Sequence, residues 1–349
     1  MSTPSKQKAL VLPSPHAQFI VTELNVPKPG LGEILVKVQA ASLNPVDGLI
    51  QKFNVLVSKY PAILGVDPAG DVVALGEGVN GFEIGDKVFF QAIFDNRRAA
   101  YQQYTIAKSE VVAKIPPNMN YDTVVTFPCA GGAAYLGLFD SLPYGLGLPN
   151  PLVAGYKPKA GQTILIIGGS STVGQFAIQF AKLAGISTVI VTASQKHTAH
   201  LVALGATHVV DRFLPPQEIE LKITEIIDKK PLTIVLDAIS HPDTQKLGYD
   251  LISTSEGGNM AVVMDEAVKN KVENKKIGRV SVVRENPEDR EDMRLLYSKI
   301  GSMLSDGTIK PPRLEVLGNG LAGVPAGLQR IGDGQVSGTK LVVHPPETP

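Results

Sequence analysis

The sequence predicts an α/β protein with a β-rich first half and a doubly wound second half. Before residue 130, short β-branched apolar runs are separated by Pro and Gly, which is typical of a β-barrel-like domain. From about residue 160, apolar runs alternate with helix-length segments, which is typical of parallel strands joined by helices. A chain of 349 residues is long enough for two cores.

Composition restricts the classes of function. Lys and Arg total 33 and Asp and Glu total 33, so no net charge attracts nucleic acid or an anionic membrane. Cys129 is the only cysteine, which excludes an internal disulfide and fits a reducing compartment. The chain shows neither the apolar core of a signal peptide nor an uncharged apolar run of membrane-spanning length. We expect a cytoplasmic protein without nucleic-acid or membrane partners.

The sequence predicts separate sets of strands in the two halves of the chain. In the first half, residues 34–40 and 70–76 are predicted strands, bounded by turn pairs such as Asn80-Gly81. Residues 142–151 are too rich in Pro and Gly for a regular element. The second half offers six strands, enough for a six-stranded parallel sheet: Thr163–Ile167, Thr188–Thr192, His208–Val210, Leu232–Asp237, Asn259–Val263 and Arg279–Val283.

The last part of the chain returns to the first domain in this prediction. An amphipathic helix is expected over residues 287–304, followed by Gly-rich sequence and a final strand, Lys340–Val343. That strand cannot extend a completed six-stranded sheet without disturbing it. We therefore predict a β-barrel-like domain over residues 1–130, an α/β domain over 131–290, and a return of residues 291–349 to the first domain.

A Gly-rich turn joins the first strand of the second half to a helix. It contains Gly169, Ser170, Ser171, Thr172, Val173 and Gly174. Small residues let the backbone approach a pyrophosphate, and the amides at the helix N-terminus attract it. The glycine pattern is degraded, with Ser171 at the middle position, but the strand-turn-helix context favours a dinucleotide site. A tight turn without a ligand is the alternative.

The end of the second strand indicates which dinucleotide binds. An NAD site carries Asp or Glu about 20 residues beyond the loop. Here that position is Ser194, followed by Lys196 and His197. A hydroxyl and a cation suit a 2′-phosphate, so the sequence favours NADPH. Lys196 as a solvated residue at the start of the next helix is the alternative.

Several segments together resemble the medium-chain dehydrogenase/reductase superfamily over the whole chain. They are Ala41–Asp47, Leu64–Gly70, Gly85–Val88, the Gly-rich turn and Ser337–Val343. The resemblance implies a GroES-like β-barrel catalytic domain, a Rossmann domain and a C-terminal return. Zinc-dependent members have Cys near Asn44-Pro45 and Gly-His-Glu where this chain has Gly65-Val66-Asp67. Both ligands are replaced, so we expect no metal.

The sequence is similar to the zinc-independent branch of quinone oxidoreductases, alkenal reductases and enoyl reductases. The segments at 191–194, 236–239 and 146–149 are similar to fungal enoyl reductases that act in trans with polyketide synthases. This implies hydride transfer from NADPH to the C=C of an α,β-unsaturated carbonyl or thioester, free or carrier-bound, with a polyketide synthase as one candidate partner. Quinone reduction and a non-catalytic nucleotide-binding protein are the alternatives. Monomer and homodimer both remain open.

The resemblance also implies roles for residues in the catalytic domain. Asn44 faces the nicotinamide and polarises a substrate carbonyl or holds the cofactor carboxamide, unless it is simply a turn residue. Pro45 and Asp47 lie under the cofactor, with helix capping as the alternative for Asp47. Relatives place a Thr where this chain has Ala133. That Thr contacts the nicotinamide end of the cofactor. Mitochondrial-type enoyl reductases have an active-site Tyr near the position of Phe53, and a Phe cannot donate a proton. The proton donor is therefore unassigned, and Tyr60 is the nearest phenol that we name, with packing as its alternative.

Four further residues complete the expected cofactor site. Asp237 and Ile239 end the fourth strand, at the sheet edge where cofactors bind in this fold. Arg212 follows the third strand and is expected to cover the adenine or ribose, with an exposed arginine as the alternative. Lys340, in the closing motif, is assigned to the cofactor by the resemblance.

Overall fold

The computed structural model describes residues 3–158 and 161–349. The chain divides into two compact units. Unit 1 comprises residues 1–129, 285–307 and 311–349, and unit 2 comprises residues 130–284 and 308–310. Each unit has its own hydrophobic core, built from residues of that unit alone.

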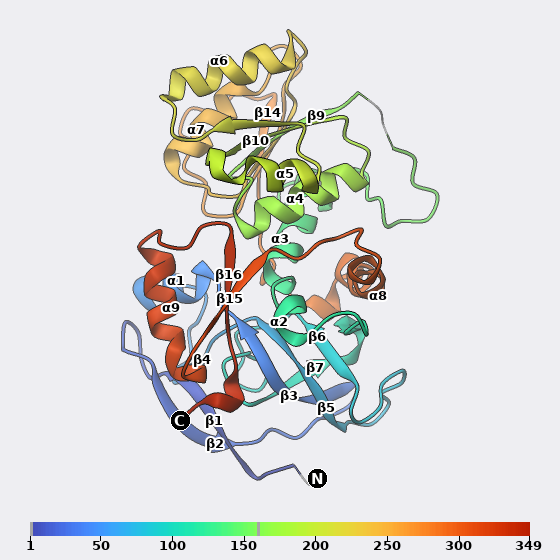
Figure 1. The fold of residues 1–349 in the computed structure, drawn as a ribbon, viewed down its shortest axis with the longest axis vertical. Helices are drawn as coiled ribbons and strands as arrows, with labels where there is room; N and C mark the ends of the chain where they lie inside the picture. The colour runs from blue at the N-terminus through green and yellow to red at the C-terminus, as the bar shows by residue number, and fades with distance from the viewer. Residues whose placement is uncertain (1–2, 159–160) are drawn as a thin grey trace. The chain divides into compact units, whose positions relative to one another are not determined.

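Unit 1 is a β-rich domain (Figure 1). One sheet has the order β2-β1-β4, and a seven-stranded sheet has the order β15-β16-β3-β5-β6-β8, with β7 paired to β3. The long strand β3 is the centre of this second sheet because it pairs with β5, β7 and β16, all antiparallel. The strands from the N-terminal half are β1 (Lys6–Leu12), β2 (Ile20–Asn25), β3 (Glu33–Ser42), β4 (Ala62–Ile63), β5 (Asp67–Leu75), β6 (Lys87–Phe90), β7 (Tyr104–Lys108) and β8 (Val112–Lys114).

The C-terminal segment supplies the remaining strands of unit 1. β15 and β16 pair in parallel, and β16 joins β3 through Val342 and Val343. These elements are β15 (Arg313–Leu317), β16 (Thr339–Val343), α8 (Glu291–Ser305) and α9 (Val324–Gly332). The other helices of the N-terminal part are α1 (Pro45–Phe53) and the short α2 (Tyr121–Val124), and α3 (Pro128–Phe139) begins at the boundary between the units.

Unit 2 contains a six-stranded, fully parallel sheet with the order β11-β10-β9-β12-β13-β14, which confirms the predicted α/β architecture. Central strand β9 is almost entirely buried and apolar, as a strand covered on both faces requires. Helix α4 packs against α5, and α6 against α7 (Figure 1). The elements are β9 (Thr163–Ile167), α4 (Thr172–Leu183), β10 (Thr188–Ala193), α5 (Thr198–Leu204), β11 (His208–Asp211), α6 (Pro216–Ile227), β12 (Ile234–Asp237), α7 (Pro242–Leu251), β13 (Gly258–Val262) and β14 (Lys275–Arg279).

Two predicted elements are displaced in the structure. The sixth strand occupies Lys275–Arg279 rather than residues 279–283. It is the edge strand of its sheet, so it does not need the continuous apolar run that the prediction looked for. The helix predicted over residues 287–304 begins at Glu291, because Arg290 is extended with φ −106° and ψ 119°. Strand β15 and helix α9 lie in Gly-rich sequence that the pattern did not identify as regular.

A segment of the Pro- and Gly-rich loop lies along the outer edge of β14. The Arg279 amide, which points away from β13, donates to the Pro143 carbonyl at 2.8 Å. A Cβ at Gly278 would come within 2.7 Å of the Gly145 carbonyl oxygen. The loop and the edge strand are therefore in direct backbone contact.

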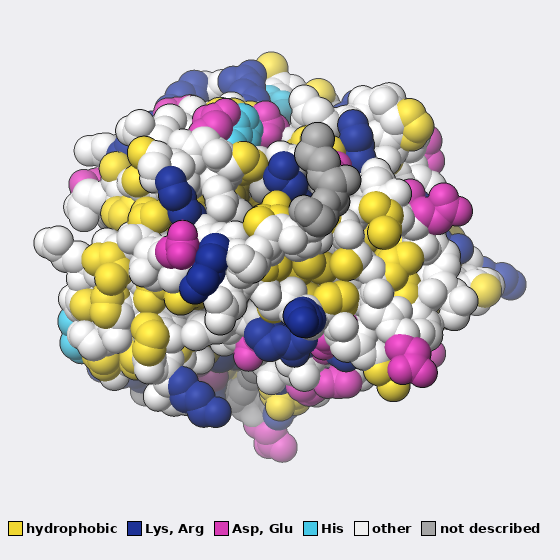
Figure 2. All heavy atoms as spheres, turned by 90° about the horizontal axis from the view of Figure 1, so that it is seen from below, with side chains coloured by type: hydrophobic (Ala, Val, Ile, Leu, Met, Phe, Trp, Pro, Cys, Tyr) yellow, Lys and Arg dark blue, Asp and Glu magenta, His cyan; other side chains and the backbone are white. Residues whose placement is uncertain are grey.

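The surface agrees with the balanced composition. Figure 2 shows acidic and basic side chains interspersed on one face, with apolar side chains between them. Within the described part of the chain, no helix is both long and apolar enough to cross a membrane.

Candidate active site

The Gly-rich turn of unit 2 forms a tight cradle between β9 and α4. The side chain of Ser171 caps α4 by accepting a hydrogen bond from the Gly174 amide at 3.0 Å. A Cβ at Gly174 would lie 2.3 Å from the Gly168 carbonyl oxygen, and one at Gly169 would lie 2.7 Å from Cβ of Val191. The turn therefore has no room for side chains at residues 169 and 174.

This cradle suits a pyrophosphate. The amides of Thr172 and Val173 are the first of α4, so they lack acceptors within the helix. Both residues are partly exposed, as are Ser170 and Ser171. The N-terminus of α4 thus offers amides and a positive dipole at an open turn, which is the arrangement that binds phosphate groups.

The segments that follow β10 and β11 carry four more predicted residues at the same sheet edge. The two strands are parallel neighbours with Ala193 opposite Asp211, and the Arg212 amide donates to the Ala193 carbonyl at 3.0 Å. Ser194 and Arg212 therefore follow adjacent strand ends. The Arg212 guanidinium lies 4.3 Å from the centre of the Phe213 ring. Lys196 is exposed and His197 is buried.

Asp237 holds the turn after β12. Its Oδ1 accepts from the Ile239 and Ser240 amides at 2.9 and 2.8 Å, and its Oδ2 accepts from Thr244 Oγ1 at 2.7 Å. The carboxylate is buried, and this burial raises the pKa of Asp237 above its ordinary value. Its oxygens are engaged within the turn, so its local effect is to position Ile239.

The Ile239 side chain covers the start of the Gly-rich turn. It is 47% exposed, and a Cβ at Gly168 would meet its Cγ1 at 2.4 Å. Ile239 therefore presents an apolar surface beside the turn, which a ligand in the cradle can contact.

In unit 1, Asn44 lies in a buried polar cluster. It precedes α1, and its backbone amide donates to Asp47 Oδ2 at 3.0 Å. Its side-chain Nδ2 donates to Asp67 Oδ2 at 2.7 Å, and its Oδ1 accepts from Lys340 Nζ at 2.5 Å. Only 3% of Asn44 and 5% of Lys340 are exposed. Lys340 is a predicted cofactor contact, and in the structure its ammonium contacts Asn44 and Asp67.

Asp67 is the acceptor at the centre of this cluster. It is fully buried, and its carboxylate also accepts from Ser42 Oγ and from the Cys129 amide, both at 2.7 Å. The Lys340 ammonium lies 3.2 Å from its Oδ2. Asp67 was not among the predicted site residues, although an acidic residue at the start of a buried strand is a usable signal.

Asp47 is a second buried carboxylate in the same region. Tyr101 donates its hydroxyl proton to Asp47 Oδ2 at 2.6 Å, and the Gly65 amide reaches Oδ1 at 3.3 Å. Burial is the main cause that raises the pKa of Asp47 to about 6, against the lowering effect of the hydrogen bonds from Tyr101 and the Asn44 amide. Both readings from the sequence remain compatible with this position, because Asp47 caps α1 through Asn44 and also belongs to the cluster.

The other predicted residues of unit 1 lie outside this cluster. Pro45 is exposed at the first position of α1, where proline is favoured. The Tyr60 hydroxyl donates to Asn54 Oδ1 at 2.8 Å, so within the described structure it is bonded to its own loop. Phe53, the last residue of α1, and Leu56 in this loop are more than half exposed.

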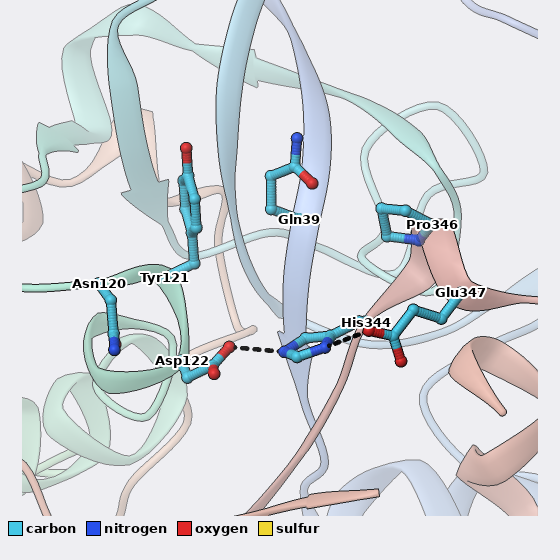
Figure 3. A pocket seen from close by; sticks show the side chains of 7 residues that line it. All are labelled: Gln39, Asn120, Tyr121, Asp122, His344, Pro346 and Glu347. Atoms are coloured by element: carbon cyan, nitrogen blue, oxygen red, sulfur yellow. Dashed lines mark hydrogen bonds and ion pairs between the residues drawn. The ribbon is translucent and has the colours of Figure 1, made fainter. Parts of the chain in front are cut away.

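A separate pocket of unit 1 was not predicted. Figure 3 shows His344 between Asp122 and Glu347, with its Nε2 at 2.8 Å from Asp122 and its Nδ1 at 3.0 Å from Glu347. Gln39 and Tyr121 also line this cavity of about 270 Å³. The pocket contains none of the residues that the sequence analysis selected.

Metal donors do not converge among residues 3–158 and 161–349, where no group of three or more His, Cys, Asp and Glu is placed to hold a metal ion. Cys129 is the one thiol of the sequence, and burial raises its pKa above the ordinary value.

Comparisons with known proteins agree with both units. A family model described as the alcohol dehydrogenase GroES-like domain matches residues 30–117, and one described as zinc-binding dehydrogenase matches residues 172–281. The dehydrogenase azaJ of Aspergillus niger is 31% identical over 97% of this chain and 99% of its own. The trans-enoyl reductase tazE of Aspergillus terreus is 33% identical over 76% of this chain and 87% of its own.

A solved structure shares the fold. The quinone oxidoreductase from Coxiella burnetii has a TM-score of 0.74 at 24% identity, covering 97% of this chain and 98% of its own. The two family models match the two units in order, and azaJ matches nearly the whole length. The chain therefore belongs to the medium-chain dehydrogenase/reductase superfamily, whose oxidoreductases use nicotinamide cofactors.

Proposed function

We propose that this protein is an NADPH-dependent, zinc-independent reductase that transfers hydride to the C=C of an α,β-unsaturated carbonyl or thioester. The observation that carries the proposal is the hydrogen bonding of the Asn44 carboxamide, which leaves one side-chain N–H to donate to a substrate. Its carbonyl oxygen is occupied by Lys340 and one of its N–H groups by Asp67. The remaining N–H can only donate, and a substrate carbonyl oxygen is an acceptor that gains negative charge during hydride addition.

The cradle of unit 2 fits the pyrophosphate of the cofactor. A side chain at Gly174 would collide with the turn itself and one at Gly169 with Val191 of β10, so the backbone is left bare where phosphates approach closely. Residues Ser170 to Val173 would hold the phosphates through their amides. When bound, the cofactor supplies the hydride.

The preference for NADPH rests on the ends of β10 and β11. Ser194 and Arg212 follow adjacent strand ends, and Lys196 is exposed two residues after Ser194. A hydroxyl and two cations suit a 2′-phosphate, whereas the segment from residue 191 to 197 contains no carboxylate for a ribose hydroxyl. One charge-assisted contact is worth about 1.5–3 kcal/mol, which corresponds to tenfold or more in affinity.

The acceptor class rests on the relatives and on the exposed loop of unit 1. Relatives of this chain include the trans-enoyl reductase tazE. Phe53 at the end of α1, and Val55 and Leu56 on the loop that follows, are exposed, where they would suit an apolar acyl chain. The substrate is therefore proposed to be a free or carrier-bound enoyl compound. A polyketide synthase is the corresponding carrier partner.

The proton that completes the reaction is proposed to come from solvent, with Tyr60 as the one side chain that we name. The hydroxyl of Tyr60 is already bonded to Asn54. In this proposal, the protein orients and polarises the acceptor, and protonation at the α-carbon follows hydride transfer.

The first experiment measures cofactor affinity by isothermal titration. We expect the dissociation constant for NADPH to be at least tenfold below that for NADH. Lys196→Glu should reduce this ratio, whereas Lys276→Glu, the same charge change on β14 at the other end of the sheet, should preserve it. Gly174→Leu should abolish binding of both cofactors. Equal affinities in the wild type would refute the NADPH assignment.

The second measurement follows NADPH oxidation with enoyl thioesters, enals and quinones. Turnover of the first two classes with little activity on quinones supports the proposal. Turnover of quinones alone would replace it with quinone reduction. Tight NADPH binding without turnover of any acceptor would favour the non-catalytic alternative.

A further inference from the structure

Lys340 and Asp67 fix the carboxamide of Asn44 in one orientation. An ammonium group can only donate and a carboxylate can only accept. The oxygen of Asn44 must therefore face Lys340, and its nitrogen must face Asp67, at the observed 2.5 and 2.7 Å. A rotation of the carboxamide by 180° would place donor against donor and acceptor against acceptor. The direction of this side chain is set by its partners.

The positive charge of Lys340 is buried at the back of that carboxamide. Lys340 is 5% exposed and Asp67 is 0% exposed, so water screens this pair little. Burying two charges costs desolvation energy that their attraction only partly offsets, and such pairs contribute little net stability. Locally, the Lys340–Asp67 pair orients the Asn44 carboxamide and produces an electric field along it.

This electric field acts on the second N–H of the Asn44 carboxamide, the one that does not donate to Asp67. A donor to an amide oxygen draws electron density toward that oxygen and leaves the N–H groups more positive, and linked hydrogen bonds strengthen one another in this way. We propose that Lys340 is a positioning residue, which aligns the Asn44 carboxamide and polarises its remaining N–H toward the substrate carbonyl oxygen. This inference rests on the proposed reduction of a conjugated carbonyl.

A positioning role of Lys340 and a direct contact of Lys340 with the cofactor predict different kinetic effects. A residue that strengthens a bond to developing charge lowers kcat when it is removed, whereas a residue that holds the cofactor raises the dissociation constant of the cofactor. Loss of a complete oxyanion donor costs about 100- to 1000-fold in kcat. Loss of only its polarising partner should cost less, roughly 10- to 100-fold.

The test uses Lys340→Met, which keeps the chain length and removes the charge. We expect kcat for an enal substrate to fall roughly 10- to 100-fold, with the NADPH dissociation constant within about threefold of wild type. Lys275→Met is the matched control. Lys275 is also buried, at 6% exposed, but it donates to the Tyr249 carbonyl in unit 2, and its replacement should leave kcat unchanged.

A double variant separates this role from loss of the fold. Lys340→Met alone leaves the Asp67 carboxylate buried without its cation, which destabilises the protein. Combined with Asp67→Asn, it removes both charges. The double variant should recover much of the melting temperature while kcat remains low. Recovery of kcat together with the melting temperature would overturn the inference.

The side-chain amide signals of Asn44 in an NMR spectrum provide a readout that does not depend on turnover. In the protein without cofactor, Lys340→Met should shift the Asn44 amide protons upfield, and Lys275→Met should not. An unchanged Asn44 signal would refute polarisation by Lys340. A weaker NADPH affinity with normal kcat would also refute it, because that result identifies a cofactor contact.

Failure of the proposed function gives a different result. It would appear in the wild-type protein, as NADPH binding without reduction of any enal or enoyl thioester. Failure of the inference alone would appear as active wild type and equally active Lys340→Met. The two failures are therefore distinguished by the first measurement in the series.

Discussion

Replacing Asp47 by Asn removes a fully buried carboxylate whose oxygens accept hydrogen bonds from Tyr101, Asn44 and Gly65. Asn has nearly the same shape but no charge. Because burial raises the pKa of Asp47 from 3.8 to about 6, the folded protein binds a proton on this group more readily than the unfolded chain does. Its contribution to stability is fully present below pH 3.8 and is lost as pH rises through 6.

The size of the effect follows from these two pKa values. Between them, the free energy of unfolding falls by up to about 1.4 kcal/mol for each pH unit because of this group. Integrated from pH 4.5 to pH 7, the loss is about 2 kcal/mol. Asp47→Asn carries no such titration. The difference in unfolding free energy between wild type and variant should therefore change by that amount, in favour of the variant at pH 7.

Urea unfolding at four pH values between 4.5 and 7 measures this difference. Glu33→Gln is a control of opposite sign. Burial alone would raise the pKa of Glu33, but hydrogen bonds from the Gly30 amide, Arg97 and Lys108 hold it below its usual value. The unfolding free energy of wild type, relative to Glu33→Gln, should therefore rise slightly as pH increases from 4.5, because most of this gain occurs below pH 4.5. A wild-type minus Asp47→Asn difference that is flat from pH 4.5 to pH 7 would show that Asp47 does not titrate in this range.

Two further predictions concern stability. Burial lowers the pKa of His344, but hydrogen bonds to Asp122 and Glu347 outweigh it and raise the pKa above 6.5. The stability that the protonated imidazole contributes is therefore fully present below pH 6.5 and is lost as pH rises through the raised pKa. His344→Gln should lower the unfolding free energy, measured by urea unfolding, more at pH 6 than at pH 9. Arg98 makes two hydrogen bonds to Glu288, at 2.6 and 2.8 Å, and both side chains are 11% exposed. Arg98→Met should therefore cost about 3–5 kcal/mol of unfolding free energy, and adding Glu288→Leu should restore most of it; a cost below 1 kcal/mol would contradict the pairing argument.

The second half of the fold could be predicted from sequence because its strands are central and apolar. β9 and β10 coincide with predicted runs, since burial on both faces leaves a nearly continuous hydrophobic signature. β14 was misplaced because an edge strand tolerates Lys275, Lys276 and Arg279. β15 follows Pro311 and Pro312 and is formed by pairing with β16. α9 follows a Gly-rich turn and is formed by packing against the unit 1 core. Both are tertiary effects.

The candidate site also has one part that the sequence predicts and one part that it does not. The Gly-rich turn is contiguous, so its residues and their spacing were visible in the sequence. The Asn44 cluster is assembled from residues that are far apart in the chain, with Lys340 nearly 300 positions from Asn44. The sequence indicated Asn44, Asp47 and Lys340 separately. It did not indicate that Asp67 links two of them or that Tyr101 satisfies the third, because no local pattern encodes contacts between distant strands.

The contact between the Pro143–Leu146 segment and β14 has a consequence for self-association. An uncovered edge strand offers a row of backbone groups to which another chain can add a strand. Here the Arg279 amide is already bonded to Pro143, and Gly278 is packed against Gly145. A second molecule that continued the sheet at this end would first have to displace the segment. The segment therefore covers this part of the β14 edge, and any strand added there would have to replace its contacts with Gly278 and Arg279.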